Sequence, residues 1–380
     1  MKIGKIEVFH VPPRWLFVRV ETDEGAIGWG EASLEGHAEA VDGAFAALRD
    51  RFVGHDPYRI EDIWQVAYRG GFYRGGPVLM SALAGLEQAL WDLKGRALGL
   101  PAWEMLGGAV RDRIRAYAWI GGDRPDEIAD AAKVRSDQGF TAVKMNATAE
   151  LDWLGTPKLF DEVVARVEAA QAAGMEVGLD FHGRVHKAMA RQLIKVLEPL
   201  GLLFIEEPLL SENADSLAAI TGNCSIPIAL GERLYSRWDF KPIFEARAVD
   251  IIQPDLSHAG GLLECRKIAA MAEAYDVAVA PHCPLGPLAL AACLQLAACT
   301  PNVAIQEMSL GIHYNTGGHD LLNFVTNKEV LTPVDGHLPI PQEPGLGVSI
   351  DEAAVREADK DRHGWRNPIW RHPDGSFAEW

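Results

Sequence analysis

The sequence lacks an apolar run of the roughly 18 residues that a membrane-spanning helix needs. Residues 1–13 carry a few basic side chains but no apolar stretch of signal-peptide length, so we expect a cytoplasmic protein with no membrane partner. Basic residues are also scarce, with 36 Lys and Arg against 53 Asp and Glu and a formal net charge of −17. This field repels phosphate backbones, and nucleic acid is therefore not an expected partner.

Cysteine is sparse, and none of it has CxxC spacing. The five cysteines are Cys224, Cys265, Cys283, Cys293 and Cys299. An odd number without paired spacing, two of them in an apolar helical run, predicts reduced thiols in a core. The composition of 48% hydrophobic and 23% charged residues excludes disordered and fibrous classes. A length of 380 residues is consistent with one large barrel and a smaller appended domain.

The first part of the chain predicts a small α+β domain over residues 1–112. Its first thirty residues alternate like an antiparallel sheet, in the runs KIEVFHV, WLFVRVETD and AIGWGEA. Helical spacing of apolar residues follows at 38–51, 59–68 and 81–97, and the last segment stops at Gly99 before Pro101.

Short apolar runs separated by amphipathic helices occupy residues 113–335 and predict parallel βαβ units. The runs are IRAYAWI, TAVKMN, EVGLDFH, LLFIEEP, PIALGE, DIIQPDL, VAVAPHC and VAIQEM. Eight such strands indicate a modified (β/α)8 barrel of the TIM type, and seven carry a polar side chain at or near the carboxyl end, where barrel active sites lie. Residues 336–380, rich in Gly, Pro, Asn and Trp, are expected to return across the first domain.

Three acidic residues end three successive predicted strands. Asp180, Glu206 and Glu232 follow one another at equal intervals of 26 residues, which indicates consecutive βα modules. Adjacent barrel strands bring their carboxyl ends side by side, so the three carboxylates should converge, and oxygen ligands of this kind suit one Mg2+. The alternative is that each carboxylate caps a helix or pairs with a basic residue such as Arg233.

Two histidines at strand ends are candidates for proton transfer. Asp255 ends the sixth strand and His282 the seventh, so Asp255 can fix the tautomer of His282 and raise its basicity as a general base. A structural His–Asp pair is the alternative. His182 lies two residues past Asp180, so strand alternation should turn both into the barrel mouth. His182 can serve as a general acid or, alternatively, as a further metal ligand.

Three more polar residues lie at strand ends and suit substrate binding. Lys144 can hold a carboxylate, Asn146 can hold a hydroxyl, and Glu307, at the end of the eighth strand, can stabilise a developing enolate. For several other polar, aromatic and glycine-rich positions we expect structural rather than catalytic roles. We interpret the glycine-rich stretch at residues 68–77 as a mobile loop. Solvated or structural roles are expected for His186, His258, His313 and His319, with contact to substrate as the alternative. Packing or subunit contacts are expected for Trp365, Trp370 and Trp380.

The ordered set of motifs resembles the mandelate racemase branch of the enolase superfamily over essentially the whole chain. The motifs are PPRWLF, YRGGFYRGGP, GLDFHGR, FIEEP, GER, IIQPDLSHAGG, APHCPLGP, QEMSLGIHYN and WRNPIWRH. The resemblance implies that residues 1–112 cap the barrel and that Asp180, Glu206 and Glu232 bind Mg2+. It also implies that His282 is the base, Asp255 its orienter, His182 the acid and Glu307 the enolate stabiliser.

The resemblance further implies dehydration of a sugar acid, most specifically D-galactonate. Racemases of this branch carry a second lysine where this sequence has Asn146, and the missing second base favours elimination over inversion. The alternatives are dehydration of another aldonate, such as gluconate or a pentonate, and a non-catalytic relative that binds sugar acids. Substrate choice is expected to depend on loops around Arg14, Trp15 and Tyr73, and a homo-oligomer is expected.

Overall fold

The computed structural model describes residues 1–122, 124–315 and 317–380. The N-terminal part holds an antiparallel sheet in the order β1 (Ile3–Val11), β2 (Trp15–Thr22) and β3 (Ile27–Glu31). Three helices accompany the sheet: α1 (Ala38–Phe52), α2 (Ile60–Arg69) and α3 (Pro77–Leu98). The expected strands and helices are present. Helix α3 starts four residues before the predicted start because Pro77 occupies its first turn, where a missing N–H costs nothing.

The eight predicted barrel strands are all present as a parallel sheet in the order β10-β9-β8-β7-β6-β5-β4-β11. The strands are β4 (Arg113–Trp119), β5 (Ala142–Asn146), β6 (Glu176–Asp180), β7 (Phe204–Glu206), β8 (Ile228–Leu230), β9 (Ile251–Ile252), β10 (Ala278–Val279) and β11 (Gln306–Met308). The helices between them are α5 (Pro125–Asp137), α6 (Lys158–Ala172), α7 (Lys187–Leu197), α8 (Ala214–Thr221), α9 (Arg237–Glu245), α10 (Leu262–Glu273) and α11 (Pro287–Cys299). Short α4 (Ala102–Met105) joins α3 to β4.

The two ends of this curled sheet meet near β10 and β11. Val279 forms a parallel bridge with Val303, and Ala304 N donates to Val279 O at 2.9 Å. Over the described residues, β11 is followed by 3-10 turns and no α-helix until α12 (Glu352–Ala358). The barrel is thus modified at its eighth unit.

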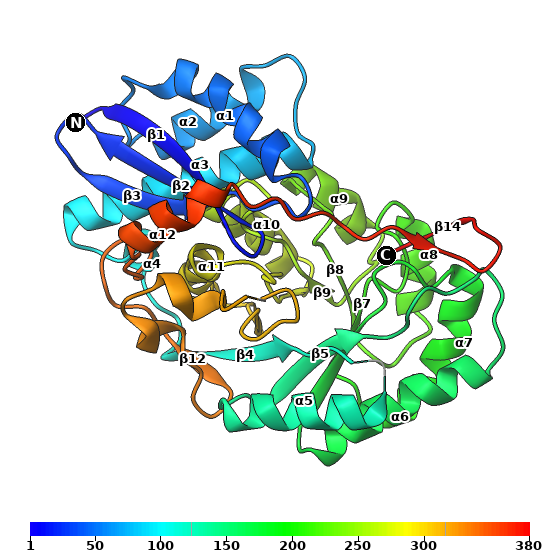
Figure 1. Cartoon of the computed structure of the whole chain (residues 1–380). Coiled ribbons are helices and arrows are strands. Elements are labelled where there is room, and N and C mark those ends of the chain that lie inside the picture. The colour runs from blue at the N-terminus through cyan, green and yellow to red at the C-terminus, as the bar shows by residue number, and fades with distance from the viewer. Residues whose placement is uncertain (123, 316) are drawn as a thin grey trace.

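The C-terminal part crosses from the barrel to the cap and back over the barrel (Figure 1). Strand β12 (His337–Pro339) pairs antiparallel with β4, and α12 then packs on β1, where Arg356 pairs with Glu7 at 3.2 Å. The chain ends in the hairpin β13 (Trp370–Arg371) and β14 (Phe377–Ala378). The division into a cap (1–112), a barrel (113–335) and a returning segment (336–380) stays our proposal.

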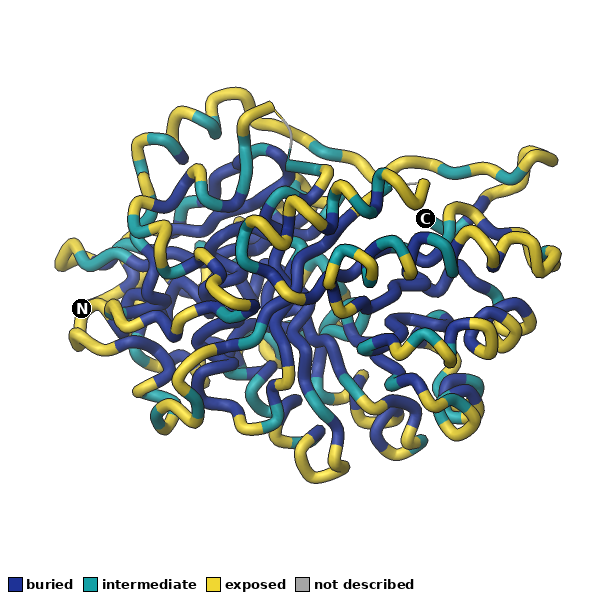
Figure 2. The backbone as a smooth tube through the Cα atoms, turned by 90° about the horizontal axis from the view of Figure 1, so that it is seen from below, coloured by how far each residue is buried: buried dark blue, intermediate teal, exposed yellow. Residues whose placement is uncertain are grey.

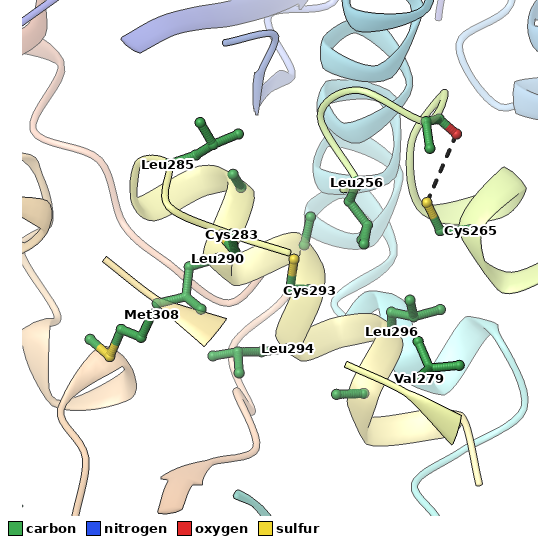
Figure 3. Close-up of a cluster of buried hydrophobic side chains, with 14 of the residues drawn as sticks. Leu256, Cys265, Val279, Cys283, Leu285, Leu290, Cys293, Leu294, Leu296 and Met308 are labelled. Atoms are coloured by element: carbon green, nitrogen blue, oxygen red, sulfur yellow. Dashed lines mark hydrogen bonds between the residues drawn. The ribbon is translucent and has the colours of Figure 1, made fainter. Parts of the chain in front are cut away.

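Helix α11 forms the centre of the core between cap and barrel. Every one of its residues is buried, and Leu290, Leu294 and Leu296 pack with Met308 and Val279 (Figure 3). Burial is densest along the barrel strands, while exposed residues gather on outer turns and helix faces (Figure 2). All five cysteines are free thiols, as predicted, but only four of them lie in the core, because Cys224 is half-buried. None of the described helices combines the length and apolar character needed to cross a membrane.

Candidate active site

A cavity of about 320 Å³ opens where the barrel strands end. Its floor and sides include His182, Glu232, His282, Glu307 and Lys144, all from barrel loops or strand ends. The cap adds Arg14, Leu34 and Glu35, and the C-terminal segment adds Asn367 and Trp380. Three regions distant in sequence thus enclose one space.

Two of the three predicted metal-binding carboxylates, those of Asp180 and Glu206, surround one lysine together with Glu307. Lys144 Nζ lies 2.8 Å from a Glu206 oxygen, 3.4 Å from an Asp180 oxygen and 3.0 Å from a Glu307 oxygen. Although burial lowers the pKa of Lys144, the surrounding carboxylates raise it well above its usual value. Burial and the charge of Asp180 raise the pKa of Glu206 to about 8. The cluster therefore carries more negative charge than Lys144 alone can offset.

The same carboxylates fit a divalent metal ion. Single ligand atoms of Asp180, His182 and Glu232 lie within 4.8 Å of one another, and so do those of Glu206, Glu232 and His282. Within the described part of the chain, Glu206 Oε1 is buried without a hydrogen bond. Asp180 Oδ2 is buried too and faces two nitrogen donors, Lys144 Nζ at 3.4 Å and His182 Nε2 at 2.9 Å. Buried carboxylate oxygens in this arrangement suit an oxygen-preferring cation. Both groups also include an imidazole, so the alternative of a histidine ligand remains open.

Glu232 belongs to both groups of candidate metal ligands and also pairs with Arg233, the basic partner that the sequence offered as the alternative to a metal. One of its oxygens lies 3.4 Å from Arg233 Nε, and the other lies 2.8 Å from His282 Nε2. Although burial raises the pKa of Glu232, the charge of His282 lowers it well below its usual value. The carboxylate is thus held ionised between two cations.

His282 and Asp255 lie together at the ends of neighbouring strands. His282 Nδ1 is 2.9 Å from Asp255 Oδ2, and Asp255 Oδ1 accepts from the amides of Ser257 and His258. Because a carboxylate accepts, Nδ1 carries a proton toward Asp255. The other ring nitrogen, Nε2, faces the cavity side and lies 2.8 Å from Glu232. Burial lowers the pKa of His282, but Glu232 and Glu307 raise it well above its usual value.

His182 reaches the cavity by a different route from the one predicted. Strand β6 ends at Asp180, and His182 has a left-handed φ of 48°, so a turn rather than strand alternation directs its side chain. Its Nε2 lies 2.9 Å from Asp180 Oδ2, and its Nδ1 lies 2.5 Å from Arg184 Nη2. A guanidinium only donates, so Nδ1 accepts and the proton resides on Nε2.

Two further predicted residues differ in how they face the cavity. Glu307 lines it and accepts from the Cys283 amide at 2.9 Å, next to His282. Asn146 is the β5 partner of Asp180 in the strand register but is not among the described residues that line the cavity. Its Oδ1 is buried without a hydrogen-bond partner in the described chain. A hydroxyl-binding role for Asn146 therefore stays a proposal.

The outer wall contains residues that the sequence did not single out. Glu35 lies 3.8 Å from Arg14 and 3.3 Å from His258 Nε2, and all three line the cavity. His258 was grouped with solvated or structural histidines, yet it is buried and lies 3.7 Å from Asp255 Oδ2. Glu35 had no detectable signal, because nothing local marks a loop glutamate as part of a distant site.

Some residues expected near substrate lie elsewhere. Trp15 is buried in the cap and stacks on Phe17, because it starts a strand that faces the cap core. Tyr73 is 85% exposed on the 70–76 loop and lies outside the described cavity wall. Of the three predicted specificity positions, only Arg14 lines the cavity.

The tail tryptophans and the remaining histidines mostly pack. Trp365 lies against Arg14 and Tyr314, and Trp370 lies over Arg184. Trp380, by contrast, lines the cavity itself, so the packing interpretation is incomplete for this residue. The histidines stack on aromatic rings: His186 on Trp153, His313 near Trp119 and Tyr314, and His319 on Phe324.

Family models match both parts of the chain. The model described as mandelate racemase / muconate lactonizing enzyme, N-terminal domain, matches residues 12–107. The model described as enolase C-terminal domain-like matches residues 127–354, more than half of the chain.

Individual relatives match over nearly the full length. A D-galactonate dehydratase of Ralstonia pickettii is 54% identical, with all of both chains covered. The crystal structure of an enolase, a candidate galactarate dehydratase from Agrobacterium radiobacter with bound Na and L-malate, is 33% identical with a TM-score of 0.90 and full coverage of both chains. A candidate dehydratase structure from Mesorhizobium loti is 33% identical, with a TM-score of 0.87 and coverage of 94% and 98%. The chain therefore belongs to the enolase superfamily, in its mandelate racemase / muconate lactonizing enzyme family.

Proposed function

We propose that this chain is a hydro-lyase that dehydrates D-galactonate to 2-dehydro-3-deoxy-D-galactonate, with His282 as the base and His182 as the acid. One observation carries the two roles. The two imidazoles share a cavity but have different partners. Asp255 accepts from His282 Nδ1, so Nε2, which lies 2.8 Å from Glu232, is the nitrogen that would take a proton when Glu232 binds the metal. Arg184 donates to His182 Nδ1, so the proton of His182 lies on Nε2. One proton acceptor and one proton donor are what an elimination requires.

The metal in this proposal is a single Mg2+ held by Asp180, Glu206 and Glu232. When bound, it supplies positive charge that stabilises the substrate carboxylate as it gains electron density. Lys144 and Glu307 lie beside this site, where Lys144 can pair with the substrate carboxylate and Glu307 can hydrogen-bond to it. Asn146 is proposed to hold a substrate hydroxyl.

The reaction then requires two proton transfers by the protein. His282 Nε2 takes the C2 proton, and the electron pair of that C–H bond enters the substrate carboxylate. As this pair returns to form a C2–C3 double bond, the C3–O bond breaks and His182 gives its Nε2 proton to the departing hydroxyl, which leaves as water. The resulting enol gains a proton at C3 and loses the proton of its C2 hydroxyl, which gives the 2-keto-3-deoxy acid.

The substrate is supported by the 54% identical D-galactonate dehydratase, and the outer wall supplies groups for a polyol. Glu35, His258 and Asn367 offer hydrogen-bonding atoms beyond the reacting end of the cavity. A sugar acid with a different hydroxyl configuration would leave some of these groups unpaired, which is how such a wall discriminates between substrates.

The test is a panel of aldonates with purified protein and Mg2+, with EDTA as the control. It includes D-galactonate, gluconate, a pentonate and the diacid galactarate. The 2-keto-3-deoxy product is followed as its semicarbazone. We expect turnover of D-galactonate that EDTA abolishes. Turnover of another acid alone would contradict the substrate, and no turnover of any acid would favour a non-catalytic sugar-acid-binding protein.

A further inference from the structure

Two buried acidic residues of the cap, Glu31 and Glu87, accept hydrogen bonds from the barrel backbone, and each also accepts one from a cap side chain, Ser33 Oγ or Trp91 Nε1. Glu31 is the last residue of β3 and Glu87 lies in the middle of α3, and both are at most 1% exposed. Neither contacts the cavity within the described residues. A buried carboxylate is costly unless it is well hydrogen-bonded, so the partners of these two indicate what they do.

Glu31 binds the start of helix α11. Its Oε1 accepts from the Gly286 amide at 2.8 Å, and its Oε2 accepts from the Ala289 amide at 3.0 Å. The first amides of a helix have no partner within the helix and carry partial positive charge, so a carboxylate stabilises them. A Cβ at Gly286 would lie 2.7 Å from Glu31 Oε2, so the glycine leaves room for the carboxylate.

Glu87 binds the start of helix α10 in the same way. Its two oxygens accept from the amides of Leu262 and Leu263 at 2.8 and 2.9 Å. Gly261 again makes room, since a Cβ there would lie 2.2 Å from Glu87 Oε2 and its φ is +93°. The cap thus places one carboxylate on each of two consecutive barrel helices.

Gln88 connects these two attachments to the loop of Asp255. Its Oε1 accepts from the Glu31 amide at 3.1 Å, and its Nε2 lies 3.2 Å from both Leu256 O and Ser257 Oγ. Leu256 directly follows Asp255. Gln88 is therefore hydrogen-bonded to the residue that follows Asp255, the carboxylate that orients His282.

The anchored helices follow the two loops that carry the dyad. His282 lies four residues before Gly286, and Asp255 lies seven residues before Leu262. On the barrel side, the loop that follows His282 is held by Glu307, which accepts from Cys283 N, and by Ser309, which donates to Leu285 O. The far ends of both loops are held by cap residues that lie outside the cavity wall.

We propose that Glu31, Glu87 and Gln88 form a latch from the cap that positions His282 against Asp255. These are positioning residues, because they act through the α10 and α11 N-termini and the 255–257 loop. The inference rests on the proposed function for its activity readout. A small displacement of a catalytic base can cost as much as 100-fold in rate, so the latch should act on kcat more than on KM.

The test compares Glu31→Gln and Glu87→Gln with the matched control Asp92→Asn. Asp92 is also a buried carboxylate on α3, but it accepts from Trp29 N and Leu346 N, in the cap and the C-terminal segment, and pairs with Arg96 on its own helix. Burial raises the pKa of Glu31 and of Glu87 to about 7, so the assays are run at pH 8, where both are ionised. We expect similar losses of Tm in all three variants.

The kinetic constants distinguish an effect on the position of His282 from a general loss of stability. In the two latch variants kcat should fall by roughly 10- to 100-fold with KM within a few-fold, while the control keeps kcat within about two-fold. If a Gln variant does not fold, Gln88→Met, which keeps the volume and removes the loop contacts, should show the same kcat-selective loss. Equal kcat in latch variants and control would overturn the proposal.

A second readout does not need turnover. The 15N shifts of His282, assigned with the His282→Asn spectrum, report the Nδ1–H bond to Asp255. They should change in the latch variants and stay unchanged in Asp92→Asn. If the wild-type protein dehydrates no aldonate, the proposed function fails, and these shifts alone decide the latch: unchanged shifts in the latch variants would overturn it.

Discussion

At the scale of the residue, neighbouring groups orient the two histidines: Asp255 accepts from His282 Nδ1, and Arg184 lies against His182 Nδ1. The sequence predicted both imidazoles and Asp255, because each lies at or just past a strand end. It could not predict Arg184 as a partner of His182 Nδ1, since the contact depends on the left-handed turn at His182. Nor could it predict the ring of carboxylates around Lys144, because their spacing shows convergence but not which cation lies between them.

Lys144 is the counterion of the cluster in the absence of metal. Replacing it in Lys144→Met leaves buried carboxylates unpaired, and we expect the metal-free protein to lose about 3–5 kcal/mol of unfolding free energy. Added Mg2+ should then raise Tm more in the variant than in the wild type, because it replaces the missing charge, while turnover falls. Urea unfolding and thermal melts with and without Mg2+ measure this, and an equal Mg2+ shift in both proteins would contradict it.

Arg184 is proposed to keep the proton of His182 on Nε2. In Arg184→Met the imidazole can adopt either tautomer, so we expect kcat for dehydration to fall by roughly 10-fold or more, up to the 10²–10⁴ that a general acid contributes. Exchange of the C2 proton by His282 should be less affected. Proton NMR of the substrate in D2O compares the two rates, and parallel losses would argue against a specific role at His182.

At the scale of the element, all eight barrel strands follow from short apolar runs with polar ends. Even β9 and β10, at two residues each, were predicted, because the pattern of strand, helix and strand-end polar residue repeats around them. The contacts between cap and barrel were beyond prediction. Glu31 and Gly286 are 255 residues apart, and no local pattern marks a glutamate whose partner is a distant helix.

Helix α11 should be sensitive to loss of volume because its whole surface is covered. In Leu294→Ala the buried side chain leaves a cavity, and we expect a loss of about 2–5 kcal/mol in unfolding free energy. Leu98→Ala, at a position on α3 that is 51% exposed, should cost within about 0.5 kcal/mol. Denaturant unfolding of both variants measures the difference, and comparable losses would mean that α11 does not organise the core.

At the scale of the whole molecule, cap, barrel and tail enclose one cavity. We expect a metal ion bound in this cavity to increase the free energy of unfolding of the whole protein. Mg2+ that binds only the folded protein adds about 2.7 kcal/mol when its concentration is 100 times its Kd. We therefore expect Mg2+ to raise Tm, EDTA to reverse the rise, and Glu232→Gln to reduce it sharply. Asp92→Asn should keep the full shift, because Asp92 lies outside the cluster. An undiminished shift in Glu232→Gln would place the metal elsewhere.

The division of labour between the two imidazoles is the central claim, and one measurement tests it most directly. His282→Asn and His182→Asn are incubated with D-galactonate and Mg2+ in D2O, and proton NMR follows both the C2 proton and the product. The account predicts that His282→Asn neither exchanges the C2 proton nor forms product. It predicts that His182→Asn forms no product from D-galactonate yet still exchanges C2 or eliminates fluoride from a 3-fluoro analogue. Normal dehydration by His182→Asn, or exchange that persists in His282→Asn, would contradict it.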